Sequence, residues 1–183
     1  MLGDLSKLKI KSSEEGVTVE LPAKPLDAIN TVVVLKVEGK LDVELIIPVQ
    51  NDKGVIELPA EMADIHNRIS TRTKLEGEKG KENISSWTAG AWIEWMFEVK
   101  AKGTFEVIAD VAVNSAETKF TVAVSTSTLQ AAVTSTGGDD KYKQVSLGQI
   151  EVSKAGVHTL RIKPIRKQWK PLNLRSASLR PVK

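Results

Sequence analysis

The sequence predicts an all-β protein: an antiparallel β-sandwich of the jelly-roll kind, preceded by a small partial β-sandwich segment. Three observations predict this class. Apolar and polar residues alternate over short runs, which is the period of a half-buried strand. These runs recur about every ten residues and are separated by turn-forming Gly, Asn, Asp and Ser. No stretch keeps the apolar spacing of an amphipathic helix over three turns.

The expected strands follow the chain in order. Val17–Leu21 alternates cleanly, and the β-branched run Thr31–Val37 is long enough for a strand buried on both faces. Val43–Val49 is a third apolar run, in which Pro48 disfavours a central position in a sheet. The charged stretch Thr71–Asn83 is expected to be a long loop. Further strands are expected at Ala91–Val99, Thr104–Val113, Thr118–Ser125, Leu129–Val133, Gln144–Val152, Val157–Lys163 and Leu172–Leu179.

Aromatic residues are scarce, and half of them are tryptophan: four Trp stand beside three Phe and one Tyr. Trp95 shares one face of its strand with Ile93 and Phe97 and is expected in the core, as are Phe105 and Phe120. The opposite face of that strand carries Trp92, Glu94, Met96 and Glu98. Trp92 is expected to be covered by the charged loop or the first domain, and the carboxylates to be solvated.

A polar, turn-forming cluster at Gln50–Gly54 predicts a domain boundary. Residues 1–58 hold 7 basic and 10 acidic side chains, whereas residues 59–183 hold 19 and 13, so the net charge changes sign. The first segment offers too few strands to close a core alone. We therefore expect a partial sandwich at residues 1–50 and a complete one at residues 54–183.

Composition and motifs argue against catalysis. The chain has no cysteine, which excludes disulfides and thiolate chemistry, and with two histidines it makes a structural zinc site improbable. Nucleophile-elbow, phosphate-loop and H-E-x-x-H motifs are missing. His66 is expected to be a hydrogen-bonded structural residue and His158 a residue on a sheet face. No apolar run approaches the roughly 20 residues of a membrane helix, and no signal-peptide pattern is visible.

The C-terminal part of the chain is basic. No acidic residue follows Lys154, and Arg161–Lys183 carries eight Lys or Arg. A basic stripe beside Trp169 is compatible with nucleic-acid binding through phosphate contacts and base stacking. The small net charge of +3 and the lack of nucleic-acid signatures favour another interpretation, in which these cations keep exposed strands and edges from pairing. We therefore expect no nucleic-acid partner.

Two tryptophans are expected in loops at strand ends, Trp87 ahead of one strand and Trp169 between Pro164 and Pro171. A flat indole stacks well on the apolar face of a pyranose, so exposed loop tryptophans are typical of sugar-binding sites. The alternative is that each indole plugs an end of the sandwich. Tyr142, which follows the Gly137–Asp140 turn, has the same two interpretations.

The first 48 residues resemble the end of a bacterial α-L-fucosidase, a glycoside hydrolase. The resemblance rests on four segments whose order and spacing agree: Met1–Asp4, Leu8–Ile10, Gly16–Pro22 and Asp27–Val37. In that family a (β/α) barrel carries catalysis and a C-terminal β-sandwich follows it. No residue here matches the barrel, so no catalytic residue is carried over and this chain is expected not to be an enzyme.

The rest of the chain resembles a jelly-roll carbohydrate-binding module of the kind attached to such enzymes. The matching segments are Leu58–His66, Ile84–Trp95, Phe97–Val99, Ala101–Val107, Val145–Ile150, Gly156–Leu160 and Leu172–Leu179. Related modules often hold a structural calcium, but Pro59 and Arg175 stand where two of its acidic ligands would be, so no metal or other cofactor is expected. Phe105 replaces the more usual tyrosine.

The two resemblances imply a non-catalytic accessory region of an α-L-fucosidase-like enzyme. It would bind a glycan, fucosylated in the simplest case, or support the parent catalytic domain, in the periplasm or outside the cell. The implied site consists of Trp87, Tyr142, Trp169, Lys170, Asn173 and Arg175, at the loop ends; the concave sheet face is the other possible location. A purely structural or oligomerisation domain is the alternative. The length implies a piece of a longer protein. Because no apolar run is long enough for a membrane helix, no membrane partner is expected.

Overall fold

The computed structural model describes residues 7–13, 16–24, 32–34, 36–39, 46–67 and 72–182. The chain separates into two compact units, residues 1–44 and residues 45–183. In the first unit β1 (Lys9–Ser13) and β2 (Gly16–Glu20) form an antiparallel two-stranded sheet. The strand expected at Val17–Leu21 is therefore confirmed, with its bounds moved back by one residue.

The two other strands expected in this region are not found in its described residues. Val32, Val34 and Val37 are exposed and lie outside any strand, while Thr31 and Leu35 fall outside the described residues. Residues 43–45 fall outside the described residues; of residues 46–49, Ile46 is exposed and only Val49 makes a bridge, to Glu98. An apolar β-branched run forms a buried strand only where other elements cover it, and the described residues show no such cover.

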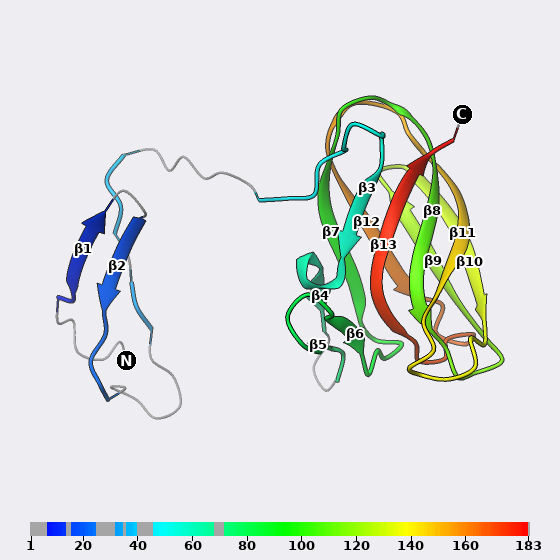
Figure 1. The fold of residues 1–183 in the computed structure, drawn as a ribbon, viewed down its shortest axis with the longest axis horizontal. Helices are drawn as coiled ribbons and strands as arrows, with labels where there is room; N and C mark the ends of the chain where they lie inside the picture. Colours follow the sequence, from blue (N-terminus) through cyan, green and yellow to red (C-terminus); the bar gives the residue numbers. More distant parts are fainter. Residues whose placement is uncertain are drawn as a thin grey trace. The chain divides into compact units, whose positions relative to one another are not determined.

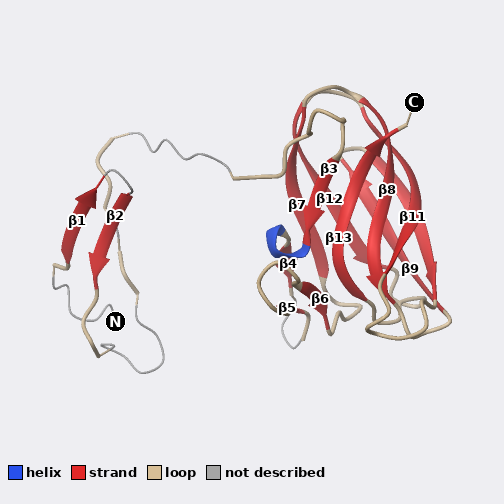
Figure 2. Ribbon diagram, viewed as in Figure 1, coloured by secondary structure: helices blue, strands red, loops and turns tan. Residues whose placement is uncertain are grey.

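The second unit is a sandwich of two antiparallel sheets, which Figures 1 and 2 show as two layers of arrows. The five-stranded sheet has the order β10, β9, β12, β7, β4, and the six-stranded sheet the order β11, β8, β13, β6, β5 with β3 paired to β13. The strands are β3 (Ile56–Pro59), β4 (Asp64–His66), β5 (Lys74–Glu76), β6 (Asn83–Ser85), β7 (Trp92–Val99), β8 (Gly103–Ala112), β9 (Glu117–Val124), β10 (Ser127–Thr134), β11 (Lys143–Val152), β12 (Gly156–Pro164) and β13 (Asn173–Pro181). A 3-10 helix, Ala60–Met62, joins β3 to β4.

These elements confirm the predicted all-β class and the seven strands expected after residue 90. The stretch Thr71–Asn83 is corrected: it is not wholly a loop, because it contains β5, which pairs with β6 along its whole length. Gly77 permits the connection between β5 and β6 with a φ of 120°, since a β-carbon there would lie 2.9 Å from the Lys81 carbonyl oxygen. No helix in the part of the chain described is long and apolar enough to cross a membrane.

The core lies between the two sheets and is filled by alternate residues of their inner faces. Trp95, Phe97, Phe105 and Phe120 are at most 2% exposed, which confirms their expected place in the core. Trp95 also donates its indole N–H to the Pro59 carbonyl at 2.7 Å, so its only polar atom is satisfied.

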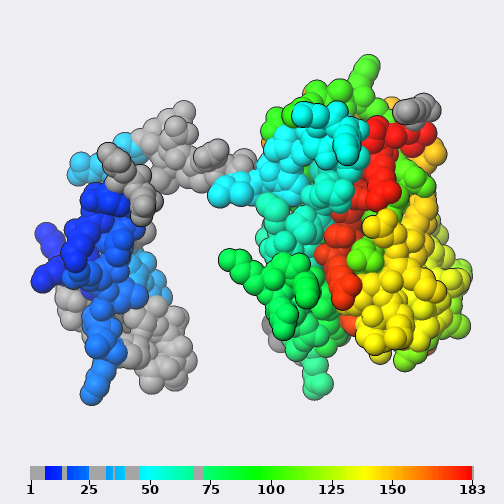
Figure 3. Space-filling view, in the orientation of Figure 1, coloured from blue at the N-terminus to red at the C-terminus, as the bar shows by residue number. Residues whose placement is uncertain are grey.

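The C-terminal strand β13 is central in its sheet although it is last in the sequence. It pairs with β8 along one edge and with β3 and β6 along the other. In Figure 3 the red atoms of this strand run between the cyan region of β3 and the yellow region before β11. Residues around position 175 thereby meet residues around position 142, far away in the sequence.

The segment that enters the second unit is bonded to strand β7. Pro48 O accepts from the Glu98 N–H at 2.8 Å, and the Gln50 N–H donates to Glu98 O at 3.0 Å. The Gln50 side chain is 7% exposed; its Oε1 accepts from the N–H groups of Lys100 and Ala101, and its Nε2 donates to Gly54 O. Residues 48–50 thus pack with the second unit, whereas the sequence analysis places the boundary just after them.

Candidate carbohydrate-binding face

Trp87 and Trp169, the two loop tryptophans of the predicted site, lie inside the sandwich end. They are 1% and 8% exposed, and their ring centroids are 5.0 Å apart. The Trp169 N–H donates to Trp87 O at 3.1 Å, and the Trp87 N–H donates to Ala91 O at 3.2 Å. Neither indole offers a free face in this structure, so their part in sugar stacking stays a prediction and their observed role is packing.

Tyr142 and Arg175 of the predicted site do come together at the loop end. The Arg175 guanidinium carbon lies 3.6 Å from the centroid of the Tyr142 ring, a cation–π contact that covers one ring face. Burial raises the pKa of Tyr142 above its ordinary 10.0, and the positive charge of Arg175 opposes that rise. The pair is thus already stacked before any ligand arrives.

The remaining predicted residues are polar groups around that end. The Asn173 side chain donates to Asp139 O at 2.8 Å, which ties β13 to the loop before β11. The Lys170 N–H donates to Thr118 Oγ1 at 2.9 Å, and Thr118 in turn donates to Lys170 O at 2.7 Å. These bonds hold the loops against the sandwich; Lys170 remains exposed, and Asn173 is half-buried.

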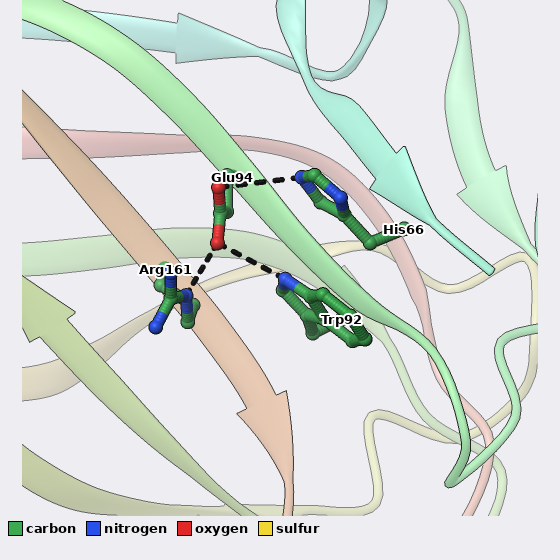
Figure 4. Close-up of polar contacts among 4 residues, drawn as sticks. All are labelled: His66, Trp92, Glu94 and Arg161. Carbon is green, nitrogen blue, oxygen red and sulfur yellow. Dashed lines mark hydrogen bonds and ion pairs between the residues drawn. The ribbon is translucent and has the colours of Figure 1, made fainter. Parts of the chain in front are cut away.

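An aromatic pair stands instead on the outer face of the five-stranded sheet. Trp92 of β7 and His66 of β4 are register partners, so both side chains point to the same face. Their rings stack with centroids 4.9 Å apart and planes inclined by 2° (Figure 4). Trp92 is half-buried and lies on the solvent side of the sheet, opposite Trp95 in the core.

Glu94 holds this pair in place. Its Oε1 accepts from the Trp92 N–H at 3.0 Å and also from Arg161 Nε of the neighbouring strand β12, as Figure 4 shows. Its Oε2 lies 3.3 Å from His66 Nε2, close enough for electrostatic attraction but without hydrogen-bond alignment. Burial alone would raise the pKa of Glu94, but the hydrogen bonds from Arg161 and Trp92 and the charge of Arg161 outweigh it and lower the pKa. The carboxylate is therefore charged and fixed.

A broad hollow of about 530 Å³ lies beside this cluster on the same face. Its lining combines apolar Met96, Ala123 and Val157, the hydroxyls of Ser125 and Thr159, and the cations Lys154 and Arg161, with His158 in its wall. A second, small pocket of about 40 Å³ is lined by Trp92, Lys163, Pro164 and Arg166 with residues 89–91. The two hollows lie along the same pair of strands, one on each side of the Glu94–Arg161 ion pair.

His158 fixes the wall of the larger hollow. It takes an inward position on β12 and is 6% exposed, so it is more deeply buried than a residue of an open sheet face. Its Nε2 lies 2.9 Å from Lys154 O, and its Nδ1 lies 2.9 Å from Ser125 Oγ. Because a carbonyl can only accept, Nε2 carries the proton and Nδ1 can accept from the serine hydroxyl. His66 is the last residue of strand β4.

The described residues contain no group of three or more His, Cys, Asp or Glu side chains that could hold a metal ion. What the outer face offers is a fixed indole, hydroxyls, apolar patches and cations. That combination suits a ligand with flat apolar faces and many hydroxyl groups, since stacking and hydrogen bonding are then both available.

The family model of carbohydrate binding module family 6 matches residues 59–180, more than half of the chain. The chain therefore belongs to carbohydrate-binding module family 6. A module of this kind is a non-catalytic domain, in agreement with the sequence analysis. No curated protein matches the chain.

Solved structures show the same fold at low sequence identity. A family 35 carbohydrate-binding module from Clostridium thermocellum aligns over 70% of this chain and 98% of its own, with 18% identity and a TM-score of 0.58. The module CBM6cm-2 of Cellvibrio mixtus lichenase 5A, solved with cellotriose, aligns over 69% and 97%, with 19% identity and a TM-score of 0.53. CsCBM6-3 from Clostridium stercorarium, solved with cellobiose, aligns over 69% and 93%, with 20% identity and a TM-score of 0.54.

Sequence reasoning did not identify the outer-face cluster of Trp92, His66, Glu94 and Arg161. The alternation of β7 already places Trp92, Glu94 and Met96 on one face, but it does not show which strand lies beside them. The pairing of β7 with β12, which brings Arg161 opposite Glu94, joins residues 67 positions apart. That pairing is the missing information.

Proposed function

We propose that this module binds a glycan on the outer face of the five-stranded sheet, with Trp92 as the stacking platform. The observation that carries the proposal is the fixed Trp92–His66–Glu94 cluster beside a hollow of about 530 Å³. Membership of a carbohydrate-binding family supports a sugar as the ligand, and the exposed position of this face supports its location.

The chemistry of the face fits a sugar chain. His66 covers one face of the indole and Glu94 takes its N–H, so the ring is oriented before binding and little ordering entropy is lost. The apolar carbon–hydrogen face of a pyranose can stack on the indole. Thr159 and Ser125 in the hollow can bond to sugar hydroxyls, while Met96 and Val157, 39% and 49% exposed, offer apolar contact.

The loop end is the second candidate location. Tyr142, Arg175 and Asn173 meet there, with the exposed Lys170 side chain on the same set of loops, but Trp87 and Trp169 are buried beneath. A ligand at this end would have to stack on the uncovered face of Tyr142 or displace Arg175. The sheet face requires no such rearrangement and is therefore favoured.

We further propose, on the resemblance of residues 1–48 alone, that the parent protein is an α-L-fucosidase-like glycoside hydrolase. The module would then direct the parent catalytic domain toward fucosylated glycans in the periplasm or outside the cell. Comparing the binding of fucosylated oligosaccharides with that of their defucosylated forms tests this part. Equal binding of both forms would remove the support for a fucosylated ligand.

The site itself is tested by two matched variants of the full chain, Trp92→Ala and Tyr142→Ala. We expect affinity electrophoresis in gels containing neutral polysaccharides such as xylan, β-glucan or galactan to show retardation of the wild type. Trp92→Ala should weaken retardation about tenfold, because loss of aromatic stacking costs roughly 1–3 kcal/mol. Tyr142→Ala should bind as the wild type does. The reverse result would place the site at the loop end, and no binding to any glycan would contradict the proposal.

A further inference from the structure

We infer that the binding face is built for an anionic polysaccharide, one that carries carboxylate or sulfate groups. The inference rests on the proposed function and names the ligand class for that same face. It follows from the arrangement of charged side chains around strand β12. This strand contains the start of the basic C-terminal segment, and sugar stacking does not account for the charge of that segment.

Four cations accompany β12 along the face. Lys154 and Arg161 line the larger hollow, and Lys163 and Arg166 line the smaller pocket. From Val157 to Lys163 a strand advances about 20 Å, so these cations can contact several consecutive sugar residues. In the part of the chain that the structure describes, no acidic residue lines either hollow.

Three of these cations have no carboxylate partner in the described segments. Among the described residues, Lys154, Lys163 and Arg166 form no ion pair or side-chain hydrogen bond. Arg161 gives only its Nε to Glu94, which leaves its two terminal amino groups without a partner in the described part of the chain. A guanidinium edge of this kind suits a carboxylate or sulfate, because it can donate two parallel hydrogen bonds.

Three acidic groups of this face lie on one side of β12. Glu94 and Glu98 on β7 and Asp64 on β4 are on the far side of β12 from β9. Toward β9 the neighbours of Arg161 and Lys163 are Ala123 and Thr121, and beyond them come Thr128 and Gln130 of β10. Glu117 near the end of β9 is paired with Lys119 at 3.1 Å. An anion lying over β12 and β9 therefore meets cations and neutral polar groups.

A nucleic acid would also be attracted by this charge, but the face suits it less well. Binding of single strands uses several aromatic side chains for successive bases, whereas Trp92 and His66 form one stacked platform on this face. The hollow instead offers apolar contact and hydroxyls next to the cations. A polysaccharide is therefore favoured, and single-stranded DNA serves as a comparison ligand in the test.

The experiment uses the full chain and pairs of polymers that differ only in charge. The pairs are de-esterified and fully methyl-esterified galacturonan, which differ in carboxylates, and sulfated and desulfated fucan, which differ in sulfates. We expect calorimetry or affinity electrophoresis to give at least about fivefold tighter binding to one charged polymer than to its neutral form. The pair whose charged member binds more tightly shows whether the face recognises carboxylate or sulfate.

Salt and substitution then locate the effect. Raising the ionic strength from about 0.01 M to about 1 M shortens the Debye length from about 30 Å to about 3 Å and should abolish the preference. The double variant Lys154→Ala/Lys163→Ala should weaken binding of the charged polymer about tenfold and change binding of the neutral form less than about twofold. The control Lys100→Ala/Lys102→Ala removes the same charge from the exposed turn between β7 and β8 and should keep the preference.

The possible outcomes separate the two proposals. If the wild type binds neutral and charged polymers equally and Trp92→Ala binds both more weakly, glycan binding is upheld and the inference is overturned. Equal losses in both lysine double variants would also overturn it, since net charge rather than this face would then act. Tighter binding to single-stranded DNA than to any polysaccharide would overturn it in favour of a nucleic acid. No binding to any polymer would overturn the proposed function and the inference together.

Discussion

His66 and Trp92 stack in parallel at a centroid distance of 4.9 Å, and both rings are adjacent to the carboxylate of Glu94. His66 covers one face of the indole, and Glu94 accepts a hydrogen bond from the indole N–H. Such fixation matters for a sugar ligand, because weak stacking contacts contribute to affinity only if the platform need not be ordered first.

The charge of Glu94 should make the stability of this cluster depend on pH. Its pKa in the folded protein is lower than the ordinary 4.5, so its charged form contributes stability above that pH and loses it as pH falls through the lowered pKa. Glu94→Gln should therefore cost about 1–2 kcal/mol of unfolding free energy at pH 7 and progressively less in acid. Urea unfolding of both proteins between about pH 3 and pH 7 measures the difference in their free energy of unfolding.

The control for this series is Glu98→Gln, on the same face of β7, because the Glu98 side chain makes no ion pair in the described part of the molecule. The difference in unfolding free energy between Glu98→Gln and the wild type should stay near zero at every pH. A difference for Glu94→Gln that grows in acid would contradict the assigned role of the carboxylate.

Gln50 should anchor the entry of the chain into the second unit. Gln50→Ala leaves the partly buried N–H groups of Lys100 and Ala101 without their acceptor, which should cost about 1 kcal/mol. Thermal or urea unfolding should show a loss of that size. Gln130→Ala, on the exposed face of β10, should change stability by no more than about 0.5 kcal/mol. Equal effects at both positions would argue against the anchor.

Trp169 should act in packing rather than in ligand binding. Trp169→Ala removes a buried ring that contacts Trp87 and Phe120, and we expect a loss of about 3–5 kcal/mol. Trp169→Phe keeps part of the ring, loses the bond to Trp87 O, and should cost less. If folded Trp169→Phe retained its stability but lost glycan binding, the loop-end site expected from the sequence would be supported instead.

Tyr142 is the single tyrosine of the chain, so tyrosinate absorbance reports on it alone. Its midpoint should lie above pH 10.0, because burial disfavours the phenolate. Arg175→Gln keeps a side chain over the ring but removes the positive charge that favours the phenolate, so the pKa should rise further. A downward shift would mean that the guanidinium mainly shields the ring from water. Arg180→Gln, further along β13, should leave the titration unchanged.

The seven strands after residue 90 could be predicted from the sequence because each depends on its own alternation and turns. The core positions of Trp95 and Phe97 followed from the same period. Thr31–Val37 shows the limit of this reasoning, since a β-branched run indicates a strand but not whether anything covers it. Its described valines are exposed.

The site depended on contacts between distant segments and could not be predicted in the same way. Trp87 and Trp169 are of the residue type that stacks on sugars, but they lie 82 positions apart in the sequence and bury each other in the fold. Arg161 meets Glu94 only because β12 pairs with β7. Charge counting did detect the basic end of the chain, and the pairing of the strands then placed its first members on the same face as Trp92.

Strand β7 carries both Trp92 and, at Glu98, the bonds to Pro48 and Gln50. With a glycan held at Trp92, a pull on the chain ahead of Pro48 would reach the ligand along one covalently continuous strand, over about 20 Å. Mechanical load would pass from residues 48–50 to Glu98 through two backbone hydrogen bonds and then along the backbone of β7. A module arranged in this way can tether whatever precedes it to a surface while its sandwich stays intact.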